Sequence, residues 1–216
     1  MSHESGLNPE KTDFVLPQMG VKYIGKGDYC PDYLCVNKSI SWKISDMPHI
    51  MYERSCKVKT SNRTKILATI IQPYFNRTYK HFSSHFQTPP ERNTGFPAVT
   101  MTGRIGYISS PVFKAYKLHG YVVYRQLIEN LLDLFLPEKL VRADLPSNCQ
   151  VTVTEQKNRW VMHLLHYIPE RRADGLDIIE DVIPLYNLKV CVRTGWFPSK
   201  VYLAPEMRQI EFKQNG

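Results

Sequence analysis

The residues whose types could do chemistry gather between positions 72 and 90, where polar and aromatic side chains follow an apolar run. Planar polar groups beside flat aromatic faces are typical of a sugar-binding surface, because hydroxyls take the hydrogen bonds and ring carbons pack on the aromatic face. The candidate sugar-binding set is Tyr74, Asn76, Arg77, His81 and His85. The alternative is a structurally locked loop, in which Arg77 and the histidines bond to backbone carbonyls.

Metal binding is the second chemistry to weigh in this segment. His81 and His85 stand four residues apart, so on a helix they would share one face, as two zinc ligands do. No glutamate lies between them and no third ligand is evident. We therefore expect neither a metal nor any other cofactor.

Catalytic constellations are missing elsewhere in the chain. His163 and His166 stand three apart in a predicted strand and should point to opposite faces, as should the neighbours Glu180 and Asp181. Adjacent acids of a strand cannot flank one glycosidic bond. No G-x-S-x-G elbow occurs either. The sequence thus predicts no catalytic residue.

Charge is concentrated in one part of the chain. The 216 residues carry 28 lysines and arginines against 20 acidic residues, a net charge of +8, and residues 51–100 alone carry eight basic and two acidic residues. Such a basic segment could bind phosphates or nucleic acid, but no recognised binding motif accompanies it. We expect a solvated surface and no nucleic-acid partner. Five of these charges surround a predicted loop at 55–64: Arg54, Lys57, Lys59, Arg63 and Lys65.

The elements that would position the 72–90 segment predict an α/β domain. Residues 65–71 form a continuous, β-branched apolar run, the pattern of a strand buried on both faces of a parallel or mixed sheet. Residues 97–109 predict a hairpin around Gly103-Arg104. Residues 121–136 keep helical spacing up to Pro137.

The pattern changes near residue 146. Residues 150–154 and 160–166 alternate between apolar and polar, and further short strands follow at regular spacing, which predicts a small antiparallel β-sandwich. We therefore expect two domains, 1–145 and 146–216. No apolar run could cross a membrane and no signal peptide is evident, so the expected location is cytoplasmic, with the five scattered cysteines free.

A family resemblance joins several of these segments. Residues 73–78, 81–85 and 88–90, with 161–167 and 180–185, resemble the C-terminal region of bacterial glycoside hydrolases of the α-L-fucosidase-like and β-galactosidase-like type. The resembling region carries a β-galactosidase trimerisation domain and then a small β-domain. It implies an incomplete glutamine-amidotransferase-like (flavodoxin-like) α/β fold before the β-sandwich.

The resemblance also implies a role. Its members hold their two catalytic carboxylates in a (β/α)8 barrel that has no counterpart in this sequence. The family pattern places a cysteine and a glutamine-histidine pair where this chain has Ser83 and Phe86-Gln87. We therefore expect a non-catalytic portion that serves oligomerisation, as a homo-oligomer or with a barrel-bearing partner, and that helps shape a carbohydrate pocket. The alternative is a free-standing carbohydrate-binding or protein-interaction module. The third hypothesis is nucleic-acid binding through residues 54–65.

Overall fold

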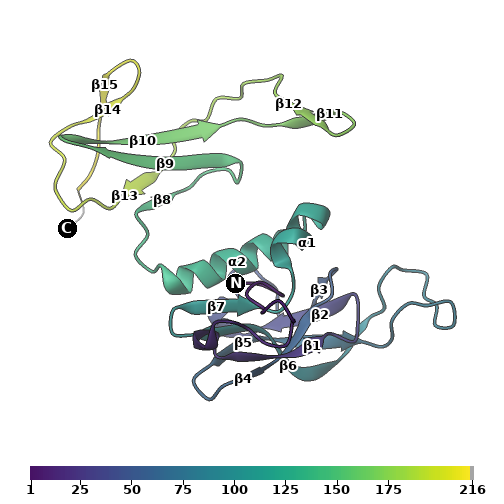
Figure 1. Cartoon of the computed structure of the whole chain (residues 1–216). Helices are drawn as coiled ribbons and strands as arrows, with labels where there is room; N and C mark the ends of the chain where they lie inside the picture. Colours follow the sequence, from purple (N-terminus) through teal and green to yellow (C-terminus); the bar gives the residue numbers. More distant parts are fainter. Residues whose placement is uncertain (215–216) are drawn as a thin grey trace. The chain divides into compact units, whose positions relative to one another are not determined.

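The computed structural model describes residues 1–214, and the chain forms two compact units: unit 1, Met1–Pro137, and unit 2, which begins at Glu138. Each is described here by itself. Unit 1 is a curled antiparallel sheet with two α-helices, and unit 2 is a set of small two-stranded antiparallel sheets (Figure 1). No helix of the described residues is long and apolar enough to cross a membrane. All five cysteines are free thiols, as predicted.

The main sheet of unit 1 has the strand order β3-β2-β5-β6-β7, and each neighbouring pair is antiparallel. Bulges interrupt the register between β5 and β6 at several points. Because a bulge bends its strand and increases the local twist, the sheet curls into a half-barrel. The strands are β2 (Asp32–Val36), β3 (His49–Met51), β5 (Lys65–Pro73), β6 (Pro90–Thr102) and β7 (Ile105–Ile108).

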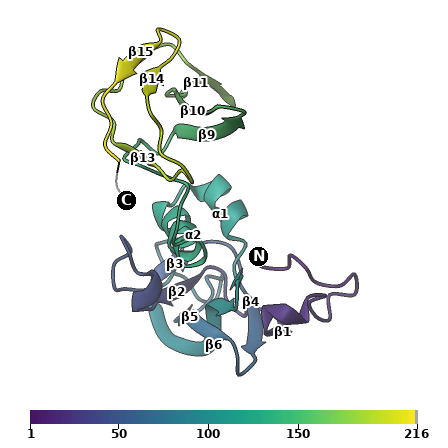
Figure 2. The same ribbon diagram turned by 90° about the vertical axis from the view of Figure 1, so that its left-hand side faces the viewer.

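Two helices, α1 (Val112–His119) and α2 (Val122–Phe135), cover one face of this sheet (Figures 1 and 2). Gly120 separates them at φ +60°, a left-handed conformation that costs glycine little and lets the chain turn. The helix predicted over 121–136 is confirmed as α2, and the hairpin predicted over 97–109 as β6 and β7. The main core joins the helices to the sheet through Leu34, Ile70, Val99, Tyr124 and Leu127, among others.

A second, smaller core lies beside the first. Strand β1 (Val21–Lys26) pairs with β4 (Cys56–Thr60), and this ribbon packs against β7 through Val58 and Tyr107. Phe14 contacts Tyr107 edge-on at a centroid distance of 5.2 Å. Two short 3₁₀ turns, η1 (Pro17–Met19) and η2 (Lys38–Ile40), complete unit 1.

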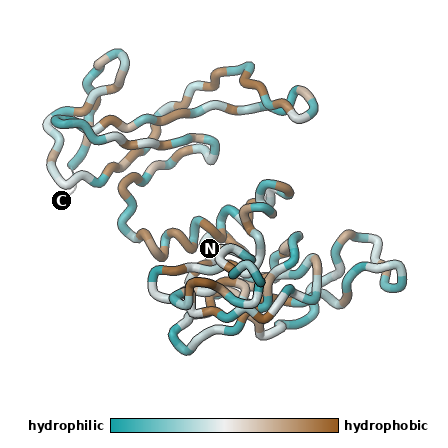
Figure 3. The backbone as a smooth tube through the Cα atoms, in the orientation of Figure 1, coloured by the Kyte–Doolittle hydropathy of each residue, from teal (hydrophilic) through white to brown (hydrophobic). Residues whose placement is uncertain are grey.

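Unit 2 consists of four two-stranded antiparallel sheets: β9 with β10, β11 with β12, β8 with β13, and β14 with β15. Hydrophobic and hydrophilic residues intermingle along its strands (Figure 3). No residue in the described range 138–214 is buried. The strands are β8 (Val141–Ala143), β9 (Cys149–Gln156), β10 (Arg159–His166), β11 (Glu170–Ala173), β12 (Leu176–Ile178), β13 (Val190–Val192), β14 (Val201–Leu203) and β15 (Arg208–Ile210).

The predicted fold class, an incomplete flavodoxin-like α/β domain followed by a β-sandwich, is wrong. The described residues contain no parallel sheet, and the strands of unit 2 do not join into two facing sheets. The apolar run at 65–71 is typical of a strand buried on both faces, and such burial is common in parallel sheets but not restricted to them. Strand β5 is instead the middle strand of a curled antiparallel sheet, and between Leu67 and Pro73 all its residues but Thr69 are buried.

Candidate functional site

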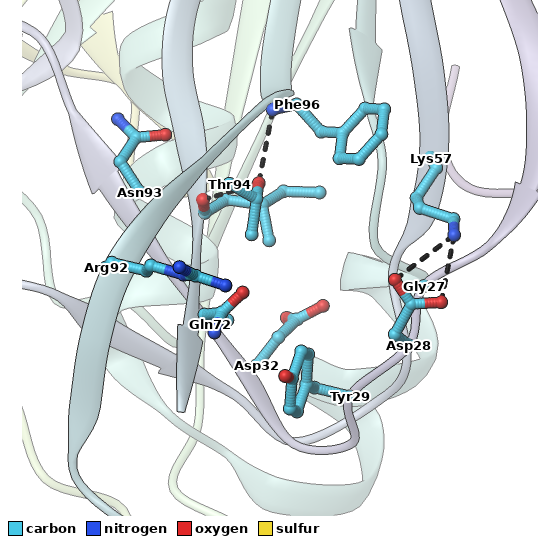
Figure 4. A pocket seen from close by; sticks show the side chains of 11 residues that line it. Gly27, Asp28, Tyr29, Asp32, Lys57, Gln72, Arg92, Asn93, Thr94 and Phe96 are labelled. Carbon is cyan, nitrogen blue, oxygen red and sulfur yellow. Dashed lines mark hydrogen bonds and ion pairs between the residues drawn. The ribbon is translucent and has the colours of Figure 1, made fainter. Parts of the chain in front are cut away.

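A cavity of about 290 Å³ opens on unit 1 beside the ends of β2, β4, β5 and β6. Figure 4 shows polar side chains from three strands pointing into it from one side, and aromatic side chains bordering it. Its lining residues are Gly27, Asp28, Tyr29, Asp32, Lys57, Ile70, Gln72, Arg92, Asn93, Thr94 and Phe96.

Strand register explains how three polar residues come together there. Gln72 of β5 pairs directly with Arg92 of β6. Tyr33 of β2 pairs with Ile71 of β5, so the antiparallel register continues with Asp32 beside Gln72. Directly opposed residues of neighbouring strands project from the same face. Asp32, Gln72 and Arg92 therefore form one row across β2, β5 and β6, which we call the polar row.

Asp32 is the most buried member of the polar row, at 2% exposure. Its Oδ1 accepts a hydrogen bond from the Ser55 hydroxyl at 3.1 Å, and its Oδ2 accepts one from the Ser55 backbone N–H at 3.3 Å. Burial raises the pKa of this carboxyl to about 7, because desolvation disfavours the charged form more than the Ser55 hydrogen bonds and Arg54 favour it. Asp32 can therefore be protonated or ionised near neutral pH.

Gln72 and Arg92 differ in how much of their bonding capacity is used. Gln72 is buried, and its Nε2 donates to Glu91 Oε2 at 2.6 Å. Its Oε1 accepts no hydrogen bond from a described residue. The exposed Arg92 side chain makes no hydrogen bond or ion pair within residues 1–214. The polar row thus presents an acceptor and a free guanidinium to the cavity (Figure 4).

The remaining walls are aromatic or internally paired. Lys57 binds Asp28 Oδ1 at 2.9 Å, and its ammonium also lies 5.9 Å from the centre of the Phe96 ring. Thr94 donates to the Ile70 carbonyl and accepts from the Phe96 N–H. The rings of Phe96 and Tyr29 give the cavity its apolar surface.

The predicted sugar-binding residues lie on the loop 74–88 between β5 and β6, which projects from the sheet without regular secondary structure (Figure 1). The loop is closed at its base, because the Tyr33 hydroxyl donates to the Thr88 carbonyl and Thr88 donates to that of Phe75. Tyr74 is exposed beside this closure.

Asn76 is the loop residue that reaches the cavity wall. Its Oδ1 accepts from the Cys30 N–H at 2.9 Å, and its Nδ2 donates to the Asp28 carbonyl at 2.8 Å. The side chain therefore fixes the segment that carries Asp28 and Tyr29, two of the lining residues. Asn76 positions the wall and does not line the cavity.

The other three candidates stay outside the cavity. The Arg77 guanidinium lies 5.0 Å from the centre of the Phe82 ring, and the His81 ring lies 5.7 Å from that of Phe75. His85 is exposed, and its carbonyl accepts from the Ser83 hydroxyl. The structure thus does not bring Arg77, His81 and His85 together with the polar row.

Sequence reasoning passed over Asp32, Gln72 and Arg92. Gln72 opens the 72–90 segment but is not among its candidate residues, and Arg92 is counted only as one of the basic charges. The one available signal was an aspartate directly before the apolar stretch at 33–36. That aspartate becomes part of a site only because the antiparallel register of β2 and β5 places it beside Gln72.

Another group of donors lies near the start of the chain, where His3, Glu4 and Cys56 bring ligand atoms within 4.8 Å of one another. Lys11 already binds Glu4 Oε2 at 2.7 Å. Burial raises the pKa of the Cys56 thiol to about 12, which favours the protonated form over the thiolate that metals bind.

The basic loop predicted at 55–64 is the turn after β4 and part of that strand. Two of its charges are engaged in unit 1: Arg54 donates to the Gly27 carbonyl at 2.7 Å, and Lys57 pairs with Asp28. His163 and His166 lie in β10, as predicted. Glu180 and Asp181 do not lie in a strand as predicted, because β12 ends at Ile178, and both are exposed.

Comparison with known proteins relates this chain to a glycoside hydrolase. A scan against protein-family models and a search of curated protein sequences each found no match. Among solved structures, the whole chain matches a region of an enzyme of that class, with a TM-score of 0.91 and 30% sequence identity. The enzyme is alpha-L-fucosidase isoenzyme 2 from Paenibacillus thiaminolyticus, and the chain spans 33% of its length.

Proposed function

We propose that this chain is a non-catalytic portion of a carbohydrate-active glycoside hydrolase, which serves assembly and helps to shape a carbohydrate pocket. The supporting observation is the structural match to a third of an alpha-L-fucosidase over the entire length of the chain. A match of this extent includes both units, so the proposal concerns them as one functional portion.

The acids of the cavity support a non-catalytic role. Glycosidases use two carboxyl groups, one on either side of the scissile bond, as acid and as nucleophile or base. In this cavity Asp28 is ion-paired with Lys57, and Asp32 is bound through both oxygens to Ser55. Each acid is thus engaged by a different neighbouring residue, and the two do not form a pair of free carboxyl groups for a glycosidic bond.

Hydrolysis by the purified chain tests this part. We expect no release of nitrophenol from nitrophenyl α-L-fucoside or nitrophenyl β-D-galactoside above the buffer rate. Turnover that disappears in Asp32→Asn and persists in Glu180→Gln would instead make the cavity an active site and overturn the non-catalytic role.

Assembly is supported by the apolar surface of unit 2. Large side chains such as Val182, Tyr186 and Phe197 are at least 73% exposed, and no residue between 138 and 214 is buried. Folding draws most of its stability from apolar burial, so a unit without buried residues needs a covering surface. Exposed apolar area of this kind marks interfaces.

The loop 74–88 adds a second exposed apolar surface. Tyr79 is fully exposed, and Phe82 and Phe86 are each more than 60% exposed. Aromatic residues are enriched at protein interfaces, where they bury large areas at low entropic cost. We propose a second copy of the chain or a barrel-bearing polypeptide as the partner.

Light scattering combined with limited proteolysis tests the assembly. A mass that rises to a multiple of the monomer supports the homo-oligomer. A monomeric mass with rapid cleavage in residues 138–214 supports the barrel-bearing partner, since unit 2 then lacks its cover. A monomer in which unit 2 resists the protease would contradict both the homo-oligomer and the barrel-bearing partner.

A further inference from the structure

We propose that the cavity beside the polar row binds one neutral monosaccharide, held by Asp32, Gln72 and Arg92 against the rings of Phe96 and Tyr29. This inference deepens the proposed function and rests on it for the choice of sugars as the first ligands to test. The class of ligand follows from the cavity itself.

Size makes the cavity suitable for a small molecule. Its volume of about 290 Å³ lies at the lower end of the range of roughly 300–1,000 Å³ that is usual for small-molecule sites. The cavity therefore has room for a single sugar ring.

Hydrogen-bonding capacity remains free on each member of the polar row. An ionised carboxylate offers about four acceptor positions, and Ser55 uses two of those on Asp32. Gln72 Oε1 and the Arg92 guanidinium make no hydrogen bond within residues 1–214. Sugar hydroxyls both donate and accept, so adjacent hydroxyls can satisfy the acceptors on Asp32 and Gln72 and the donors on Arg92 together.

The charge balance favours a neutral ligand over an anion. Lys57 is neutralised by Asp28 at 2.9 Å, so its charge is not available to an incoming anion. Asp32 stands in the same row as Arg92 and opposes it in sign. Asp28 is neutralised by the same pair, and Asp32, when ionised, offsets Arg92, so the cavity offers no net positive charge to a phosphate or carboxylate.

Aromatic rings supply the apolar contact that a sugar face needs. The carbon-bound hydrogens of a pyranose pack well on an aromatic ring, whose face is electron-rich. Phe96 lies across the cavity from the polar row, and Tyr29 lies beside Asp32 (Figure 4). The cavity thus offers aromatic carbon at two places, opposite the polar row at Phe96 and next to Asp32 at Tyr29.

Direct binding tests the inference with the full chain and free monosaccharides as probes. We would titrate L-fucose, D-galactose and D-glucose separately, following ligand signals by saturation-transfer NMR. We expect saturable binding of at least one sugar with a Kd on the order of 1 mM. Arg92→Ala and Gln72→Ala should each weaken binding about tenfold, as is usual when a ligand hydroxyl loses its partner.

Two matched controls separate the cavity from general effects. Arg63→Ala removes an exposed arginine of the basic loop, and Arg77→Ala removes the arginine of the loop 74–88; neither should change the Kd. Circular dichroism confirms that each variant is folded. Saturation by none of the three sugars, or equal binding by folded Arg92→Ala, would overturn the inference.

Failure of sugar binding and failure of assembly would appear in different measurements. Loss of assembly would appear in light scattering and leave sugar titration unaffected. An absence of sugar binding would leave the assembly results intact. Binding abolished by Arg77→Ala but not by Arg92→Ala would place the sugar on the loop 74–88 and contradict the cavity.

Discussion

The buried carboxyl of Asp32 should make unit 1 less stable as pH rises, and Asp32→Asn should remove that dependence. The folded-state pKa of Asp32 is about 7, against an ordinary value of 3.8. Between these two values the folded state binds the proton and the unfolded state does not. Ionisation therefore opposes folding: its cost is absent below about pH 4, grows through the interval, and is complete above about pH 7.

The size of the effect follows from the shift. About three pKa units at about 1.36 kcal/mol each give a cost of about 4 kcal/mol at high pH, and a slope of up to about 1.4 kcal/mol per pH unit within the interval. Replacing the titrating carboxyl of Asp32 therefore changes the free energy of unfolding by a large fraction of its usual value for a domain, roughly 5–15 kcal/mol.

Urea unfolding at a series of pH values from about 4.5 to about 8.5 measures the slope. Both α-helices of the described residues belong to unit 1, so the helical circular dichroism signal reports its unfolding. Other groups titrate in this range too, so the informative quantity is the difference between wild type and variant. Asp32→Asn should be the more stable protein above pH 7 and should lose this advantage near pH 4.5.

Asp28→Asn is the matched control, because the Asp28 side chain is 67% exposed. It should keep the wild-type slope apart from the loss of its pair with Lys57. Parallel pH–stability curves for wild type and Asp32→Asn would refute the reasoning, since Asp32 would then carry no extra proton in the folded state.

Three further outcomes follow from the contacts. Asn76→Ala removes both hydrogen bonds to the 28–30 segment and should lower the free energy of loop opening by about 1–2 kcal/mol. The measurement is faster protease cleavage in the loop 74–88. Asn62→Ala, at an exposed turn, should leave cleavage unchanged. Tyr124→Phe leaves the Tyr52 N–H and the Ile50 carbonyl without their partner and should lower the unfolding free energy by about 1–3 kcal/mol in urea titrations, whereas the exposed Tyr116→Phe should be neutral. Phe82→Ser should weaken any assembly seen by light scattering about tenfold, or about 1.4 kcal/mol, and Ser84→Ala on the same loop should not.

Local patterns in the sequence were sufficient for several elements. Helix α2 follows from apolar spacing that ends at Pro137, and the hairpin of β6 and β7 follows from Gly103 between two β-branched runs. These signals lie within a few residues of one another. The direction of β5 relative to its neighbours is set by residues far away in the chain, so a two-sided apolar strand was compatible with either sheet type.

The site shows the same limit. The candidate residues of the loop 74–88 were found because they cluster in sequence, and one of them, Asn76, does support the cavity wall. The polar row draws one residue from each of three strands, and three strands, β3, β4 and β5, lie between Asp32 and Arg92 in the sequence, the last of them carrying Gln72 itself. Only the antiparallel register of β2, β5 and β6 makes them neighbours, and that register was not predicted.

The cavity and the loop 74–88 depend on different interactions, and this separates their roles. Sheet pairing holds Asp32, Gln72 and Arg92 in place, so the loop tip can change without displacing them. The loop is attached to the wall through Asn76 and closed at Thr88, while its exposed aromatic residues are free to contact a partner. Substitutions at the tip should therefore change assembly and leave sugar binding intact, and substitutions in the polar row should do the reverse. Asn76 is the one position at which both should change together.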